Sequence, residues 1–202
     1  RCTFVNMGGA SVLWRGGEGT ACSNLWLYAC TLGPCGLDCT GGYYDVKGTH
    51  HAYLGQYQST ASVRSGVEGG VVANCVFYGR APGRHLQIGP QFRNGFVVNN
   101  TFYGNTGTAS TDSGGGVELF NENSTWTTSG NIVKNNIFST LRGHAVYGST
   151  FSPGLTGNIV AKNLAYNLTN APDGISDDYP ANYASNSQWP LFAETGGQIS
   201  SA

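Results

Sequence analysis

Charge is scarce in this chain. Asp, Glu, Lys and Arg make up 10% of its 202 residues, against a usual share of about 25%, and the formal net charge is −1. The ten Lys and Arg residues are scattered along the sequence, so there is no basic patch for nucleic acid and we expect no nucleic-acid partner. No apolar run reaches the roughly 18 residues of a membrane-spanning helix, so we expect no membrane span.

Catalytic and cofactor motifs are also missing. The sequence contains no H-E-x-x-H, no G-x-S-x-G and no Walker-type loop. Its eleven acidic residues are spread out and form no cluster suited to calcium. We therefore expect no cofactor and no metal. One alternative is a zinc site built from Cys35, Cys39, His50 and His51, whose spacing is not that of a standard zinc finger.

Glycine and small polar residues are plentiful instead. The chain has 31 glycines and is 40% hydrophobic, which favours a turn-rich all-β protein over a disordered one. A chain of this length can bury a sizeable core. We predict a single domain over residues 1–202.

Internal repetition is the main structural signal. Phe96–Gly104, FVVNNTFYG, nearly repeats Val71–Gly79, VVANCVFYG, and related units recur at Asn131–Ser139 and Asn158–Asn167. Each unit is a short β-branched run, an Asn-type residue, and then an apolar or aromatic residue. Repetition at this period is typical of a solenoid.

The register of the repeat can be fixed on the residue two before the aromatic. This marker falls on Cys2, Cys30, His51, Cys75, Asn100, Asn136 and Asn163. Seven markers predict a parallel β-helix of about seven rungs, stacked about 4.8 Å apart, with loop insertions between strands. Inward Val, Ile and Phe would stack on like residues of the next rung. An Asn at the corner would accept a left-handed backbone and bond the next rung's amide.

The repeats resemble the right-handed parallel β-helix, or pectate-lyase-like, superfamily. The segments that carry the resemblance are GGVVANCVFYG, GFVVNNTFYG, GNIVKNNIFS and GNIVAKNLAYN. It covers residues 60–170 well and 1–59 loosely, and it implies right-handedness and a secreted protein. The segment 188–193, QWPLFA, is similar to the one that often closes such repeats, with Trp189 where Asp is usual. We expect an irregular, disulfide-rich part at 1–59, regular rungs at 60–170 and a closing segment at 171–202.

Six cysteines in a low-charge chain favour an oxidising compartment, so we expect an extracellular or cell-surface protein. Stacked markers would bring Cys2 and Cys30 within disulfide range, and a buried pair of free thiols is an equal alternative. The remaining disulfide candidates are Cys22, Cys35 and Cys39. Three sequons offer possible glycosylation sites, although such triplets also arise by chance in an Asn-rich chain. They begin at Asn99, Asn123 and Asn167.

The leading functional prediction is a structural one. The chain opens with RCTFVN, which looks like a rung without a cap. A solenoid end exposes unpaired backbone and so invites head-to-tail stacking with another copy. Together with the missing active-site motifs, this predicts a non-catalytic extracellular module of a fibre, surface appendage or adhesin.

Two alternatives involve glycans. A polysaccharide lyase or glycoside hydrolase could use Arg64, Gln87 and Glu118, predicted to share one outward position on consecutive rungs beside the 104–116 loop. An ordinary solvated β face would look the same. A glycan-binding module without turnover could instead stack sugar rings on aromatic side chains, although the pattern favours tyrosines that pack on the core or cover the flank of a rung. The candidates are Tyr43, Tyr44, Tyr53 and Tyr57.

Overall fold

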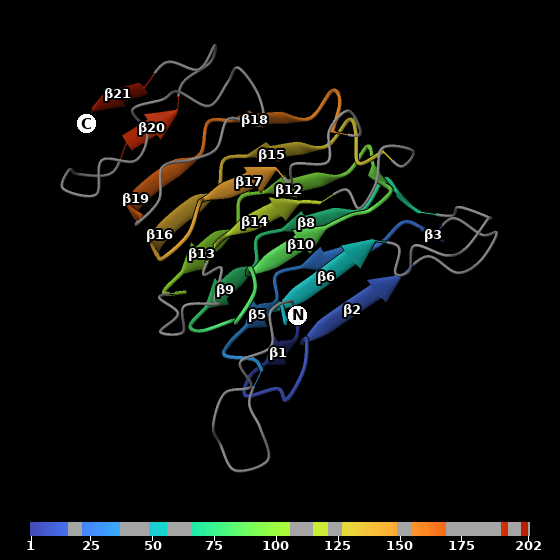
Figure 1. The fold of residues 1–202 in the computed structure, drawn as a ribbon, viewed down its shortest axis with the longest axis horizontal. Helices are drawn as coiled ribbons and strands as arrows, with labels where there is room; N and C mark the ends of the chain where they lie inside the picture. The colour runs from blue at the N-terminus through green and yellow to red at the C-terminus, as the bar shows by residue number, and fades with distance from the viewer. Residues whose placement is uncertain are drawn as a thin grey trace.

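The structure is a computed structural model. It describes residues 1–15, 22–36, 49–55, 66–105, 115–120, 127–148, 155–168, 191–193 and 199–201. Every regular element within these ranges is a β-strand, and the strands stack in layers along one axis (Figure 1). No helix long and apolar enough to cross a membrane occurs in these ranges.

The strands form four sheets. Sheet A contains β1 (Thr3–Phe4), β5 (Thr31–Leu32), β9 (Val76–Tyr78), β13 (Thr101–Tyr103), β16 (Ile137–Leu141), β19 (Leu164–Leu168), β20 (Leu191–Ala193) and β21 (Ile199–Ser201). Sheet B contains β2 (Val12–Arg15), β6 (Ala52–Gly55), β10 (Leu86–Ile88), β14 (Val117–Leu119) and β17 (Val146–Gly148). Sheet C contains β3 (Cys22–Ser23), β7 (Val67–Glu68) and β11 (Phe92–Arg93). Sheet D contains β4 (Trp26–Tyr28), β8 (Val71–Ala73), β12 (Phe96–Val98), β15 (Ile132–Lys134) and β18 (Ile159–Ala161).

The chain visits these sheets in the fixed order A, B, C, D and returns to each one strand further along, as Figure 1 shows. Sheet C is shorter than the other sheets. In the fourth circuit it is reduced to a single bridge between Arg93 and Ser129, and in the fifth circuit no sheet C strand is described. The pairings from β1 to β19 are parallel, so the molecule is an all-β solenoid, and we call one circuit a coil. The prediction of stacked parallel strands is confirmed.

Like side chains stack inside the coils, as the repeat predicts. The rings of Phe77 and Phe102 lie 4.8 Å apart, and those of Phe102 and Phe138 lie 4.9 Å apart, with nearly parallel planes. All three are fully buried. The spacing of the rings is the spacing of the strands, so the aromatic position of each repeat builds one continuous column.

Asparagines hold the corner between sheets D and A, which is two residues long in every described coil. Its first residue has a left-handed backbone, as at Asn99 (φ 57) and Asn135 (φ 56). Its second residue forms a buried ladder: Asn136 Oδ1 accepts from the backbone N–H of Asn100 at 2.9 Å, and its Nδ2 donates to Val97 O at 2.9 Å. We expected one asparagine to supply both the left-handed backbone and the hydrogen bond to the next coil. Two neighbouring residues share these roles instead. Asn131 forms a similar buried ladder at the corner between sheets C and D.

His51 is not a marker, which corrects the predicted register. Thr31 in β5 pairs directly with Val76 in β9, so Cys30 and Cys75 lie on adjacent coils. His51 instead precedes β6 in sheet B. The reason is local: among the described residues no sheet D strand lies between β5 and His51, whereas one precedes each later marker in the A ladder. Six of the seven expected markers therefore share one parallel ladder.

The predicted disulfides are absent among the described cysteines. No disulfide joins any two of Cys2, Cys22, Cys30, Cys35 and Cys75, and Cys39 lies outside the described residues. The thiols of the ladder occupy asparagine positions instead. Cys75 Sγ accepts from the Cys30 N–H at 3.4 Å and lies 3.3 Å from Leu27 O, where an asparagine would place its Nδ2 donor. The thiols of Cys30 and Cys75 thus already have hydrogen-bond partners within the fold.

The parallel ladder of sheet A ends at its C-terminal side. Strand β20, which belongs to the segment QWPLFA, pairs antiparallel with β19, and β21 pairs antiparallel with β20. At the other end, Trp14 holds an inward position in β2, paired with the buried Leu54, yet it remains 40% exposed.

Candidate functional site

The outer face of sheet B carries a line of polar and aromatic side chains. Gln87 and Glu118 are direct partners across β10 and β14, as predicted, while their neighbours Leu86 and Val117 point inward and are buried. Arg64 lies outside the described residues. The position that it was expected to hold beside Gln87 is taken by Tyr53 of β6, which corrects the predicted set.

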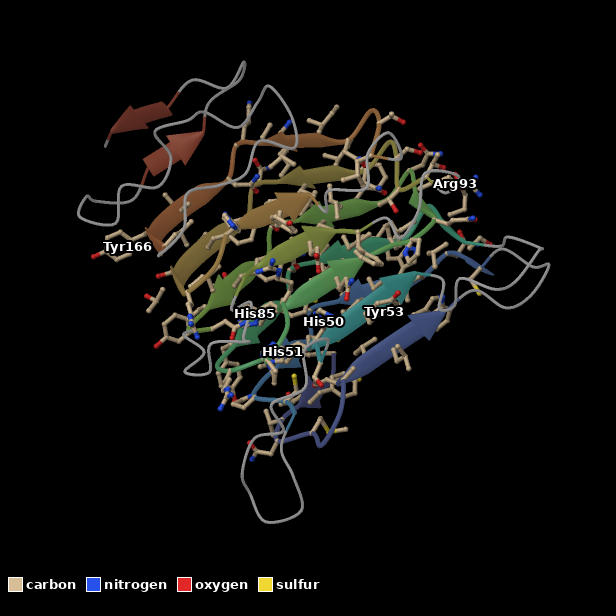
Figure 2. The ribbon with its side chains drawn as sticks, viewed as in Figure 1. His50, His51, Tyr53, His85, Arg93 and Tyr166 are labelled. Carbon is tan, nitrogen blue, oxygen red and sulfur yellow. The ribbon has the colours of Figure 1, made fainter. Side chains whose placement is uncertain are left out.

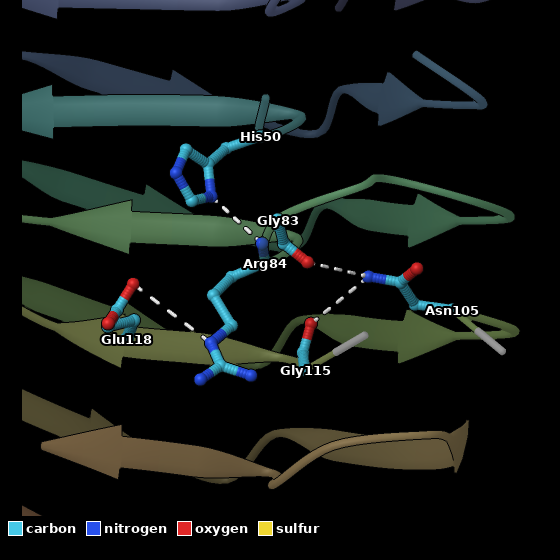
Figure 3. Close-up of polar contacts among 6 residues, drawn as sticks. All are labelled: His50, Gly83, Arg84, Asn105, Gly115 and Glu118. Carbon is cyan, nitrogen blue, oxygen red and sulfur yellow. Dashed lines mark hydrogen bonds and ion pairs between the residues drawn. The ribbon is translucent and has the colours of Figure 1, made fainter. Parts of the chain in front are cut away.

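Arg84 joins this line from the segment that leads into β10. Its Nε lies 4.0 Å from Glu118 Oε2, and its guanidinium carbon lies 4.9 Å from the ring centre of Tyr147 (Figure 3 shows the ion pair). Tyr147 pairs with Glu118 in the next strand and stacks on His144. A cation, a carboxyl group and aromatic rings from three consecutive coils are therefore brought together.

The backbone around Arg84 is held by its neighbours. His50 Nδ1 accepts from the Arg84 N–H at 2.8 Å (Figure 3). Asn105 Nδ2 lies 3.4 Å from the carbonyl oxygens of Gly83 and Gly115 on either side. A Cβ on Gly115 would lie 2.8 Å from an Arg84 nitrogen, so glycine makes room there for the guanidinium.

Burial sets the protonation of the site. Loss of solvent raises the pKa of the Glu118 carboxyl, and the positive charge of Arg84 opposes that rise only in part. Burial lowers the pKa of His50 to about 3, so this imidazole is neutral at physiological pH. A carboxyl group with a raised pKa holds a proton more tightly than a free one, which suits a general acid or base.

A histidine pair that we did not foresee lies inside the coils, at the positions directly before β6 and β10. His51 Nδ1 and His85 Nδ1 are 2.8 Å apart, and His51 Nε2 lies 3.2 Å from Arg80 O (Figure 2). The carbonyl oxygen of Arg80 can only accept a hydrogen bond, so we assign the proton of His51 to Nε2. The Nδ1 atom of His51 is then the acceptor, and Nδ1 of His85 carries the proton of the bond between the two rings. Both rings are fully buried, near Phe77 and Phe102. The sequence signal was the placement of both histidines one residue before a strand.

The zinc alternative gains no support. In the ranges given above, no group of three His, Cys, Asp or Glu side chains could hold a metal ion. His50 accepts a backbone hydrogen bond and His51 binds His85, while Cys39 is not described. Burial raises the pKa of Cys35 to about 12, which leaves its thiol protonated.

The other predicted residues are only partly placed. Tyr53 is half-buried beside Gln87, and Asn99 is exposed at a corner. Asn167 lies within β19. Tyr43, Tyr44, Tyr57 and Asn123 lie outside the described residues. The site that emerges is therefore built from Gln87, Glu118 and Tyr53 of the prediction, with His50, Arg84, His144 and Tyr147 added by the fold.

Comparisons with known proteins give no further guide. No protein-family model matches the chain, and neither the curated proteins nor the solved structures contain a significant match.

Proposed function

We propose that the protein binds an acidic polysaccharide along the outer face of sheet B and cleaves it by β-elimination. The observation that carries the proposal is the largely buried pair of Arg84 and Glu118, 4.0 Å apart, in a line of polar and aromatic side chains. An extended polymer suits such a line, because successive coils present side chains at the regular strand spacing. The resemblance to the β-helix superfamily points to the same substrate class.

The chemistry follows from the residue types. In β-elimination a base removes the proton next to a uronate carboxylate, the C4–O4 bond breaks, a C4–C5 double bond forms, and the departing oxygen takes a proton. Arg84 is suited to hold the uronate carboxylate, which makes the neighbouring proton more acidic. Glu118 is suited to be the base, because its raised pKa strengthens its affinity for a proton. Tyr147, its partner in the next strand, has a phenol able to protonate the departing oxygen.

Hydrolysis is the less favoured reaction. Glycoside hydrolysis by the usual route needs two carboxyl groups on either side of the bond, about 5 to 9.5 Å apart. Within the described ranges the acidic side chains are Glu118 and Glu68, and Glu68 pairs with Arg93 on sheet C, 3.3 Å away. One carboxyl group beside one arginine fits elimination better.

A panel of uronate-containing and neutral polysaccharides tests the proposal. We expect products that absorb in the ultraviolet through the new double bond, from uronate polymers only. Glu118→Gln should reduce kcat at least about a hundredfold with little change in KM, the loss expected when a general base is removed. A Glu68→Gln variant, on sheet C, is the matched control and should retain activity.

Two outcomes would contradict cleavage by elimination. Uronate binding without product would favour the glycan-binding module. No binding and no product would remove the glycan function and leave the structural module.

Four other expectations remain predictions. They are the head-to-tail stacking of copies, the extracellular location, the right-handed sense of the coil and its total of about seven turns.

A further inference from the structure

The outer face of sheet D is unusually apolar. Each of its five strands points its first and third residues outward and its middle residue into the core. The outward pairs, from first to last coil, are Trp26 and Tyr28, Val71 and Ala73, Phe96 and Val98, Ile132 and Lys134, and Ile159 and Ala161. Lys134 is the one charged side chain in this set.

These strands have the composition of strands that are covered on both faces. A half-solvated sheet normally alternates apolar and polar residues, whereas WLY, VVA, FVV, IVK and IVA are nearly continuous apolar runs. The core covers the inner side only. Trp26 is 67% exposed, Phe96 42% and Ile159 44%. An aligned apolar face of this kind marks a contact surface.

The face is also kept clear of insertions. The corner after sheet D is two residues long in all five coils, and so is the corner before it in the four coils that have a described sheet C strand or bridge, for example Asn94–Gly95 and Asn99–Asn100 around β12. The long connections leave from the other corners, between sheets A and B and after sheet B. Nothing in the described chain therefore interrupts the flat surface of sheet D.

We propose that a second copy of this chain packs on this face, with the two solenoid axes antiparallel. A two-fold axis along β12 would place Phe96 on Phe96 of the second copy. It would also place Trp26 on Ile159 and Ala73 on Lys134 of that copy. The contact is self-complementary, as a two-fold interface must be.

Size favours the antiparallel arrangement. The pairs at the two ends of the face differ in size: the bulkiest, Trp26 and Tyr28, lies in the first coil, and the smaller Ile159 and Ala161 lie in the fifth. Antiparallel copies set the bulky end of one against the slender end of the other. Parallel copies would press both bulky ends together and leave a gap at the far end, which costs packing contacts.

Charge favours it too. In a parallel pair the two copies of Lys134 would lie in the same layer and repel each other within an apolar contact. In the antiparallel pair each Lys134 faces the small Ala73 of the other copy and lies one strand spacing from its Tyr28. A lysine ammonium is attracted to an aromatic face at that range.

Sedimentation of the full-length protein over a range of concentrations tests the interface. We expect dimers, and Phe96→Lys should raise the dimer Kd at least about tenfold, because the substituted residue meets itself across the axis. The control is Ile137→Lys, on the outer face of sheet A, whose side chain is equally exposed at 43%. It should leave the dimer unchanged. A monomeric wild type at every concentration, or equal effects of both variants, would overturn the proposal.

Cross-linking tests the orientation. In a Cys2→Ser background, which removes the exposed thiol among the described cysteines, Ala73→Cys and Lys134→Cys proteins are mixed and treated with a short bis-maleimide, because facing residues of packed sheets lie too far apart for a direct disulfide. An antiparallel pair gives a mixed cross-linked dimer only when both variants are present. Cross-links in the Lys134→Cys protein alone would instead indicate parallel copies and would refute the antiparallel arrangement.

Discussion

Acidification should destabilise this fold before it protonates the histidines of the folded state. Burial lowers the pKa of His50 to about 3 and that of His51 to about 4, and it lowers the pKa of His85 in the same direction. In an unfolded chain a histidine has a pKa of about 6.5. Because the folded values lie below the unfolded one, the unfolded state gains protons first as the pH falls. The stabilising contribution is complete above pH 6.5 and declines below it.

The magnitude follows from linkage. At pH 5 the solution is 1.5 units below the unfolded pKa of about 6.5, so each histidine that stays neutral in the fold costs about 2 kcal/mol of unfolding free energy. His50 and His51 together give about 4 kcal/mol, and His85 adds to the loss. A domain is typically stable by about 5 to 15 kcal/mol, so this is a large fraction. Glu118 opposes part of it, because its raised pKa makes the fold gain a proton as the pH falls.

Urea unfolding at pH 7.5 and pH 5 measures this loss. His50→Gln should shrink the difference between the two pH values by about 2 kcal/mol, because Gln can still accept the Arg84 N–H but does not titrate. A wild-type difference below about 1 kcal/mol, or equal differences in the wild type and His50→Gln, would refute the reasoning.

Three substitutions test the packing of the coils by urea unfolding. Asn136→Ala should cost about 2 to 3 kcal/mol, because it leaves the buried N–H of Asn100 without its acceptor, and a loss under 1 kcal/mol would contradict the ladder. Gly116→Ala should destabilise by more than about 2 kcal/mol, since its Cβ would lie 2.6 Å from the ring of Phe138, and a neutral effect would contradict this packing. Cys75→Asn should stabilise by about 1 kcal/mol by extending the asparagine ladder, which a destabilised variant would disprove.

The regular part of the fold was accessible from the sequence. The recurrence of FVVNNTFYG placed β12 and β13 in register with β8 and β9, because a β-branched run before a two-residue corner repeats only when coils stack. The first coils were not accessible to the same degree. His51 precedes a tyrosine at the same distance as a marker precedes its aromatic, so spacing alone could not tell a sheet A strand from a sheet B strand.

The candidate site was accessible only in part. Gln87 and Glu118 were found because they follow Leu86 and Val117 in equivalent strands. Arg84 was missed because it lies before β10 and reaches Glu118 through space rather than through equal position in a repeat. The histidine pair was missed because a buried neutral imidazole has no periodic signature of its own.

The division of corners explains why the two proposed surfaces differ. Where a corner is two residues long, an asparagine ladder and a left-handed residue fix its geometry, and an insertion would break the hydrogen bonds of the coils on both sides. Insertions are therefore confined to the corners that border sheet B. Side chains such as Arg84 come from those longer connections, which can vary between coils, so chemistry gathers on sheet B. Sheet D lies between short corners and can present only the residues of its own strands. Its regular apolar face is matched best by a second surface with the same strand spacing.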